Sequence, residues 1–230
     1  MRRPLSSVSE ALALDGLERR YGDRTALSGV TVAVPAGATL AVFGSNGAGK
    51  TTLLRVLAAL LKPHAGRAEV LGSKLPDEAW KVRGNVGYLG HESLLYRDLS
   101  VRQNLVFHAR LHGVALERVD ERIAAVGLPQ RAGDPVRELS RGMVQRAAVA
   151  RATLHDPSLL LLDEPRANLD PAAAQALEPL IGRASGKTRV IVSHDVDATL
   201  AEADLSLGLR GGKQVFAGHA EAKQVRELYA

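Results

Sequence analysis

Residues 44–51 read Gly44-Ser45-Asn46-Gly47-Ala48-Gly49-Lys50-Thr51, and this stretch decides the fold. It matches the pattern of a phosphate-binding loop, in which glycines let backbone N–H groups close around phosphate oxygens. In this pattern the lysine, Lys50, reaches the β- and γ-phosphates of a nucleotide, and the hydroxyl of Thr51 is a ligand of Mg²⁺. The stretch therefore predicts a phosphate site at the start of a helix.

The chain around this loop predicts a sheet of buried strands. Residues 39–43 are an apolar run that stops at Gly44, and apolar residues repeat at helical spacing over residues 53–61. Two further runs, 159–162 and 189–192, fit strands of a parallel sheet that is covered on both faces. Ligands of open α/β sheets lie beyond the carboxyl ends of the strands, so we expect the motifs that follow these runs to meet there.

The segments between these strands predict a helical insert. Three helices are indicated by apolar periodicity and by Gly or Pro punctuation, at residues 101–113, 117–127 and 140–155. We therefore expect an α/β fold: a P-loop NTPase (RecA-like) core with a mainly parallel sheet, an antiparallel β region near the N-terminus and an inserted helical subdomain. We expect one domain, residues 1–230, with its α/β core at 1–91 and 156–230 and its helical subdomain at 92–155.

The composition is that of an ordinary globular protein, with 46% hydrophobic and 24% charged residues. No apolar run approaches the roughly 20 residues of a membrane-spanning helix, and the N-terminal segment lacks the apolar core of a signal peptide. We therefore expect a cytoplasmic protein. The absence of Cys excludes disulfides and thiolate metal sites. The formal net charge of +5 is compatible with nucleic acid, with anionic lipid or simply with a basic surface.

Asp163 and Glu164 follow the apolar run at residues 159–162. Asp163 suits Mg²⁺, a hard cation that prefers carboxylate and water oxygens, and Glu164 can act as a general base toward an attacking water. Taken alone, such a pair is as typical of a solvated strand end as of a hydrolytic site. Together with the loop at residues 44–51, it is the expected second half of a hydrolytic site.

Residues 139–143 read Leu-Ser-Arg-Gly-Met, and this stretch separates one family from the rest. It resembles the signature loop of ABC ATPases, usually Leu-Ser-Gly-Gly-Gln, which few other phosphate-loop enzymes place before the Asp-Glu strand. The resemblance implies that Ser140 and Gly142, with Arg141 between them, bind the γ-phosphate of ATP held by a second subunit. Ser140 also fits a simple helix N-cap, and both roles can hold at once. Arg141 and Met143 differ from the residues that the family most often carries at these positions of the signature loop.

Other elements of the family fall in order over nearly the whole chain. The resemblance implies that Tyr21 stacks on adenine, that Asp170 lies in the loop through which two subunits communicate, and that His194 contacts the γ-phosphate. An ordinary surface tyrosine and a structural histidine are the alternatives. His91 stands where most of the family carries glutamine, and imidazole suits softer metals than Mg²⁺. We expect His91 to bond a metal-bound water or the membrane partner.

Residues 88–91 read Tyr-Leu-Gly-His and are followed by Arg102-Gln103-Asn104-Leu105 and Leu111-His112-Gly113. These stretches resemble the haem-exporter ATPase of cytochrome c maturation, although residues 92–98 depart from the Gln-Pro-Gly segment expected there. The resemblance implies an ATPase that uses ATP and Mg²⁺ at the cytoplasmic face of the cell membrane. Its implied partners are integral membrane permease subunits and a second ATP-binding subunit, in a homodimer, without nucleic acid.

Three other functions stay open at this point: the ATPase of a drug or polysaccharide exporter, a soluble ABC protein that acts on nucleic acid, and a small-molecule phosphate-loop kinase. Proteins of the nucleic-acid class usually carry tandem cassettes or long coiled-coil insertions, and this sequence has neither. The loop at residues 139–143 disfavours a kinase.

Overall fold

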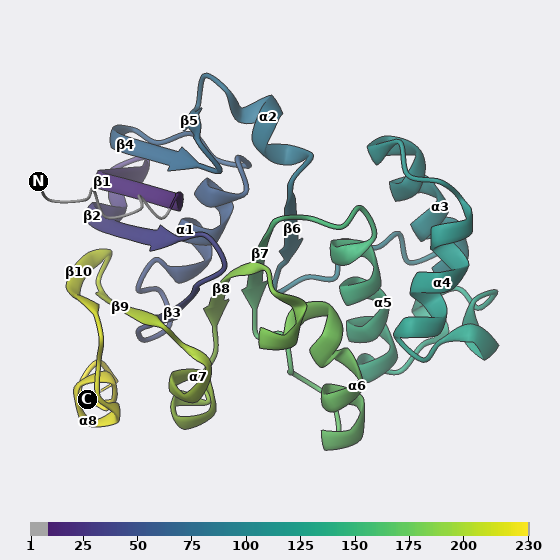
Figure 1. Cartoon of the computed structure of the whole chain (residues 1–230). Helices are drawn as coiled ribbons and strands as arrows, with labels where there is room; N and C mark the ends of the chain where they lie inside the picture. The colour runs from purple at the N-terminus through teal and green to yellow at the C-terminus, as the bar shows by residue number, and fades with distance from the viewer. Residues whose placement is uncertain (1–8, 230) are drawn as a thin grey trace, which may run out of the picture. The chain divides into compact units, whose positions relative to one another are not determined.

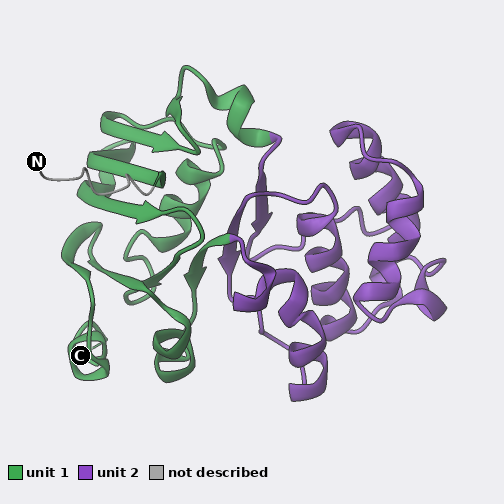
Figure 2. Ribbon diagram, in the orientation of Figure 1, with its two compact units in different colours: residues 1–83, 188–230 green, residues 84–187 purple. Residues whose placement is uncertain are grey.

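The structure is a computed structural model, and it describes residues 9–229. The chain divides into two compact units, which we describe one at a time. Unit 1 comprises residues up to 83 and from 188 onward, and unit 2 comprises residues 84–187 (Figure 2).

Unit 1 is built around strands (Figure 1). Its strands are β1 (Glu10–Tyr21), β2 (Arg24–Pro35), β3 (Thr39–Phe43), β4 (Ala65–Val70), β5 (Ser73–Leu75), β8 (Thr188–Val192), β9 (Leu205–Arg210) and β10 (Lys213–Gly218). Its helices are α1 (Lys50–Leu57), α2 (Ala79–Arg83), α7 (Val196–Glu202) and α8 (Ala222–Arg226). The strands lie side by side in the order β5-β4-β1-β2-β10-β9-β3-β8.

The sheet of unit 1 is mixed, as the sequence predicts. β3 pairs in parallel with both β8 and β9, and every residue of β3 and β8 is buried, because parallel strands of this kind are covered on both faces. β1 pairs antiparallel with β2 and β4, which confirms the antiparallel region near the N-terminus. Buried and more exposed residues alternate along much of β2, the pattern of a strand with only one covered face.

Unit 2 contains the predicted helices. Its strands β6 (Val86–Leu89) and β7 (Leu159–Asp163) pair in parallel. Its helices are α3 (Val101–His112), α4 (Glu117–Ala125), α5 (Arg141–Thr153) and α6 (Pro171–Ile181), with short 3-10 turns η1 (Pro129–Arg131), η2 (Val136–Glu138) and η3 (Arg183–Ser185). The three helices expected from the sequence are confirmed, and α4 and α5 each end two residues before the predicted limit.

Local chemistry explains where these helices begin and end. Ser100 and Gln103 form a reciprocal capping box at the start of α3, and Gly113 ends that helix in the left-handed region at φ 65°. α5 stops early because its last turn closes at Leu154, after which Asp156 takes a positive φ of 53°.

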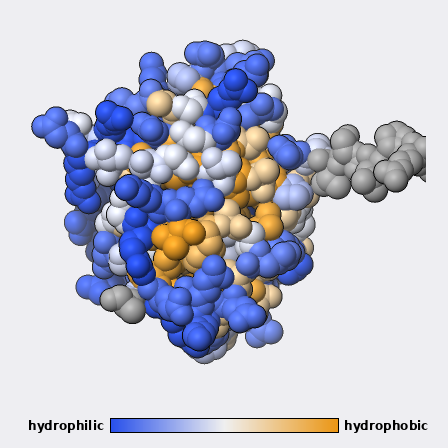
Figure 3. All heavy atoms as spheres, turned by 90° about the vertical axis from the view of Figure 1, so that its left-hand side faces the viewer, coloured by the Kyte–Doolittle hydropathy of each residue, from blue (hydrophilic) through white to orange (hydrophobic). Residues whose placement is uncertain are grey.

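The surface agrees with the composition. Figure 3 views the chain from the left-hand side of Figure 1, where polar residues cover most of the surface and hydrophobic residues gather in smaller areas. None of the helices within residues 9–229 combines the length and apolar character of a membrane-spanning segment.

A buried ion pair lies within unit 1, near the start of strand β8, which the sequence presents as a mostly apolar run. Arg189 of β8 is 1% exposed, and its guanidinium donates to Glu202 of α7 at 2.9 Å and twice to the Thr39 hydroxyl, at 2.9 and 3.1 Å. A buried cation of this kind is tolerated because the Glu202 carboxylate neutralises it and the Thr39 hydroxyl accepts hydrogen bonds from it.

We expect Glu202→Ala to lower the free energy of unfolding by about 3–5 kcal/mol, because the substitution leaves Arg189 buried without its carboxylate. Urea unfolding followed by circular dichroism measures this loss. Glu202→Gln is the matched control: it keeps an oxygen acceptor and should lose clearly less. Equal midpoints for the Ala variant and the unmodified chain would contradict the role of the pair.

Candidate functional site

The residues predicted for the site are divided between the two units. Unit 1 holds residues 44–51, Tyr21 and His194; unit 2 holds His91, Ser140, Arg141, Gly142, Asp163, Glu164 and Asp170.

The phosphate loop connects β3 to α1 and closes around its own lysine. Lys50 is 9% exposed, and its ammonium donates to the carbonyl oxygens of Gly44 at 2.5 Å and Ser45 at 3.1 Å. The amide of Ala48 donates to the Ser45 carbonyl at 3.1 Å, which tightens the turn. The loop thus holds a positive charge at the point where the helix begins.

Two glycines of this loop are required by sterics. Gly44 has φ 147°, and a Cβ there would lie 2.3 Å from the carbonyl oxygen of Leu209 in β9. Gly49 has φ 107°, and a Cβ there would lie 2.5 Å from the carbonyl oxygen of Ala26 in β2. Any larger residue would push the loop away from these strands.

The start of α1 suits an anion. Gly49 precedes the helix and offers no side-chain cap, and the first turn contains no acidic residue. The partial positive charge of a helix N-terminus is therefore left for a ligand, and phosphate is the ligand typical of this arrangement. Thr51, in the first turn, brings a hydroxyl to the same place.

Two further predicted residues belong to unit 1. Tyr21 ends β1 and is 43% exposed, with the Arg19 guanidinium 5.0 Å from its ring centroid. His194 is exposed and lies between the end of β8 and the cap of α7, Asp195, which accepts from the Ala198 amide at 3.0 Å.

In unit 2, Asp163 and Glu164 stand at the end of β7 in different surroundings. Asp163 is the last residue of the strand and is 6% exposed, whereas Glu164 is half-buried with a left-handed backbone, φ 50°. Asn168 is left-handed as well, φ 62°. Non-glycine residues rarely adopt this region, and such strained positions concentrate at functional sites.

The first turns of α5 support this strained segment, a contact that sequence reasoning missed. The Gln145 amide donates to the carbonyl oxygens of Glu164 and Pro165, both at 3.2 Å. A Cβ on Gly142 would lie 2.8 Å from the Asn168 carbonyl oxygen. The sequence carries one signal for this contact, because Gln145 follows Gly142 by three residues and so shares its helix face.

Ser140 and Asp170 both cap helices. The Ser140 hydroxyl accepts from the Met143 amide at 3.3 Å at the start of α5, and the Asp170 carboxylate accepts from the Ala173 amide at 2.8 Å at the start of α6. Ser140 and Arg141 are exposed. Unit 2 therefore brings the Ser140 loop, the Asp163-Glu164 pair and the approach to Asp170 into one region.

His91 is exposed and follows the end of β6. Behind this strand lies a basic cluster: the Arg151 guanidinium donates to the Tyr88 carbonyl at 2.6 Å, and a ring nitrogen of His155 lies 3.1 Å from the Val86 carbonyl oxygen. The ring of His112 stacks on that of His155, with centroids 4.0 Å apart.

Burial keeps this cluster less charged than its residue types suggest. It lowers the pKa of His108 and of His155 to about 4 each, with nearby Arg151 and His112 acting in the same direction. It also lowers the pKa of Arg151 to about 10. The pKa of His112 is lowered by burial and then by Arg151.

These shifts predict a loss of stability in acid. Because the folded histidines have a pKa of about 4 and unfolded histidine about 6.5, the unfolded chain takes up protons first as the pH falls. The stability that they contribute is complete above pH 6.5 and is lost progressively down to pH 4. Urea unfolding midpoints measured across this pH interval report the loss. His155→Gln should flatten the slope of the midpoint against pH.

The control is His219→Gln, because His219 is an exposed histidine of unit 1. This variant should leave the slope of the midpoint against pH as it is. A slope that His155→Gln leaves unchanged would show that acid acts elsewhere in the chain.

Each unit, taken by itself, offers an oxygen donor of the type that Mg²⁺ prefers: the Thr51 hydroxyl in unit 1 and the Asp163 carboxylate in unit 2. Mg²⁺ in nucleotide sites is held by few protein ligands together with phosphates and waters. Residues 9–229 contain no group of three His, Asp or Glu side chains that could hold a metal alone.

Comparison with known proteins adds independent findings. Residues 27–167 match the family model described as ABC transporter. The chain is 40% identical over 188 residues to a daunorubicin resistance ATP-binding protein of Streptomyces coeruleorubidus, covering 80% of this chain and 60% of that protein. It is 34% identical over 215 residues to the Nod factor export ATP-binding protein I of Ralstonia nicotianae, covering 90% and 66%.

Relatives also include an import protein. The phosphonates import ATP-binding protein of Anaeromyxobacter dehalogenans is 36% identical over 236 residues, which covers 95% of this chain and 47% of that protein. Among solved structures, an ATP-binding subunit of an ABC transporter superimposes with a TM-score of 0.86 at 25% identity, covering 96% of this chain and all of that one. The chain spans about 60% of the length of the first curated relative and 66% of the second.

Proposed function

This chain belongs to the ABC transporter family, and on that premise we propose that it binds and hydrolyses ATP to power a membrane transporter. The observation that carries the proposal is the loop of residues 44–51, folded around the Lys50 ammonium at the start of α1. That loop supplies a positive charge, a helix N-terminus and the close-packed glycines of a phosphate site.

Unit 1 would bind the nucleotide. Lys50 is already held at the loop by two carbonyl oxygens, so its charge is in place for the β- and γ-phosphates. Tyr21 is proposed to stack on adenine, which its exposure permits, and His194 to donate a hydrogen bond to the γ-phosphate. Bound Mg²⁺, held by Thr51 and Asp163, would neutralise charge on the phosphates.

Glu164 is proposed as the general base toward water. It is half-buried with a left-handed backbone, whereas Asp163 is buried at the end of the strand, and this difference in surroundings suits two different roles. Gln145 holds the backbone of this segment through two carbonyl oxygens, and a fixed base is more effective than a mobile one.

A second copy of the chain would complete the reaction. Ser140 and Arg141 are exposed at the N-terminal end of α5, with Gly142 behind them against Asn168, an arrangement suited to a phosphate that comes from outside the subunit. We propose a homodimer in which these residues bind the γ-phosphate of the opposite subunit. Asp170 caps the neighbouring helix and belongs to the segment through which the two copies would communicate.

Membrane permease subunits are the proposed partners, at the cytoplasmic face of the membrane. A groove of about 550 Å³ in unit 2 runs along α3 and includes Val106 and Phe107. Phe107 is exposed and meets Tyr96, also exposed, edge to face at 5.4 Å. Exposed aromatic side chains beside a groove are typical of a surface that binds another protein.

The cargo is proposed to be haem, exported for cytochrome c maturation. Support comes from the resemblance of residues 88–91, Tyr-Leu-Gly-His, and of the segments at 102–105 and 111–113 to that group of ATPases. The relatives named above for drug resistance, Nod factor export and phosphonate import handle different molecules. Recognition of the cargo therefore lies with the membrane subunit.

We expect Glu164→Gln to keep ATP binding while ATP hydrolysis falls by about 10²- to 10⁴-fold, the usual contribution of a positioned general base. Phosphate release and binding of a fluorescent ATP analogue measure the two properties separately.

Lys50→Ala should lose nucleotide binding itself. Near-normal turnover by Glu164→Gln would remove Glu164 from this role, and unaltered nucleotide affinity of Lys50→Ala would remove the phosphate loop from its own.

We expect His91→Gln to keep the basal ATPase rate of the isolated chain, because an imidazole is a poor Mg²⁺ ligand and glutamine is the usual residue of the family here. Its effect should fall on the stimulation of ATPase by the membrane subunits, measured in reconstituted vesicles. Abolished basal hydrolysis in the isolated variant would place His91 in the catalytic machinery instead.

A further inference from the structure

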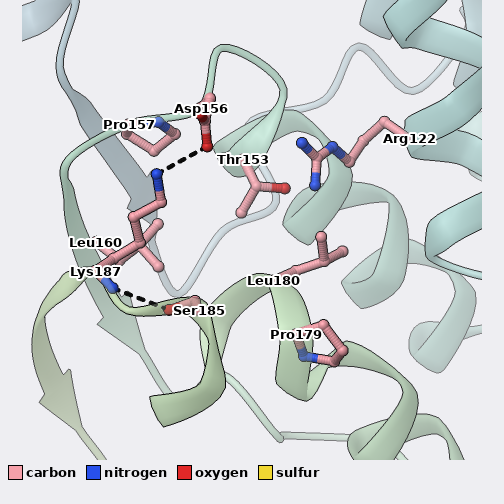
Figure 4. Close-up of a pocket in the computed structure, with 9 residues that line it drawn as sticks. All are labelled: Arg122, Thr153, Asp156, Pro157, Leu160, Pro179, Leu180, Ser185 and Lys187. Atoms are coloured by element: carbon pink, nitrogen blue, oxygen red, sulfur yellow. Dashed lines mark hydrogen bonds and ion pairs between the residues drawn. The ribbon is translucent and has the colours of Figure 1, made fainter.

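Unit 2 contains a pocket of about 220 Å³ that shares no residue with the site described above (Figure 4). Its walls come from α4, from the end of α5 through the loop to β7, and from the end of α6 with the segment that follows it. The volume is below the range of roughly 300–1,000 Å³ for drug-sized ligands, so a compact occupant is indicated.

Arg122 faces this pocket from α4, with its guanidinium turned toward the Thr153 side chain (Figure 4). It is half-buried, and within residues 9–229 its side chain has no hydrogen-bond or ion-pair partner. Burial, and then Arg118, lowers the pKa of Arg122, while Asp156 and Glu121 oppose this effect from a distance. The N–H groups of this half-buried guanidinium are therefore available to a ligand in the pocket.

Lys187 lines another wall of the pocket and is fixed in place. Its ammonium donates to the Asp156 carboxylate at 2.8 Å, and that carboxylate belongs to a side chain that is 61% exposed. The hydrogen bond from Lys187 is the main cause that lowers the pKa of Asp156, and the charges of Lys187, Arg118 and Arg122 lower it further. The three cations of this region, Arg118, Arg122 and Lys187, therefore outnumber its two carboxylates, Asp156 and Glu121.

The rest of the lining is apolar or already satisfied. Leu160, Pro179 and Leu180 contribute hydrocarbon surface. The Thr153 hydroxyl donates to the Val149 carbonyl at 2.8 Å, so its hydrogen is not available to an occupant. Donation to an anion is left mainly to Arg122, which has five N–H groups in a planar fork, and to Lys187.

We propose that this pocket binds a small organic carboxylate, with its carboxylate on Arg122 and its apolar body against Leu160 and Leu180. A planar guanidinium matches a carboxylate in a bidentate pair, and the apolar wall favours a ligand with a hydrocarbon part over inorganic phosphate. The site does not depend on the proposed ATPase function, because none of its residues takes part in it.

The test uses the purified chain and benzoate as the probe, with heats of binding measured by titration calorimetry. Benzamide, the neutral analogue, and inorganic phosphate are titrated in parallel. We expect saturable binding of benzoate and clearly weaker binding of the other two. Arg122→Gln should weaken benzoate binding by about 10- to 100-fold, the effect of losing a hydrogen-bonded charge. Arg122→Lys, which keeps the charge but not the fork, should fall between.

Arg97→Gln is the control for charge alone, because Arg97 is an exposed arginine of unit 2 outside the pocket; it should bind benzoate like the unmodified chain. Thermal unfolding checks that each variant is folded. The proposal is overturned if benzoate does not bind, if Arg122→Gln and Arg97→Gln bind it equally, or if phosphate binds and benzoate does not.

Discussion

The close approach of the phosphate loop to its neighbouring strands is the constraint on which the rest of unit 1 depends. β3 is buried along its whole length between β8 and β9, so the chain must turn as soon as it leaves the sheet. Gly44 makes this turn against the Leu209 carbonyl, and Gly49 closes the loop against the Ala26 carbonyl. Since both contacts exclude a Cβ, the sheet itself sets the loop around Lys50 and the direction in which α1 begins.

In unit 2 the segment that follows β7 has an unusual backbone conformation, and contacts with α5 hold it in place. Glu164 and Asn168 adopt left-handed backbones that few non-glycine residues adopt, at a cost of order 1–3 kcal/mol each. The Gln145 amide donates to the carbonyl oxygens of Glu164 and Pro165. Gly142, which has no Cβ, lets α5 approach the Asn168 carbonyl oxygen closely. The helix that begins with Ser140 thus fixes the segment that carries the proposed base, and a shift of one would move the other.

Much of this was predictable from local patterns. Continuous apolar runs predicted the parallel strands, and apolar periodicity that ends at Gly113 predicted α3. The contacts that were missed join residues far apart in the chain, and local patterns such as the spacing of Gly142 and Gln145 do not identify their partners. Gln145 reaches Glu164 across 19 positions. Arg189 is tolerated in a strand because the Glu202 carboxylate neutralises it and the Thr39 hydroxyl, 150 positions away, accepts its hydrogen bond.

The net charge of +5 left three explanations open, and the structure shows that several arginines of this basic chain have roles inside the protein. Arg189 is buried in an ion pair, and Arg151 is desolvated behind β6 with its guanidinium on the Tyr88 carbonyl. Arg122 faces a pocket and not the open surface. Arginines used in this way contribute little to the field at the surface, which screening by water and salt weakens further. A basic composition is therefore weak support for nucleic-acid binding here, because some of its cations hold the protein's own backbone and carboxylates.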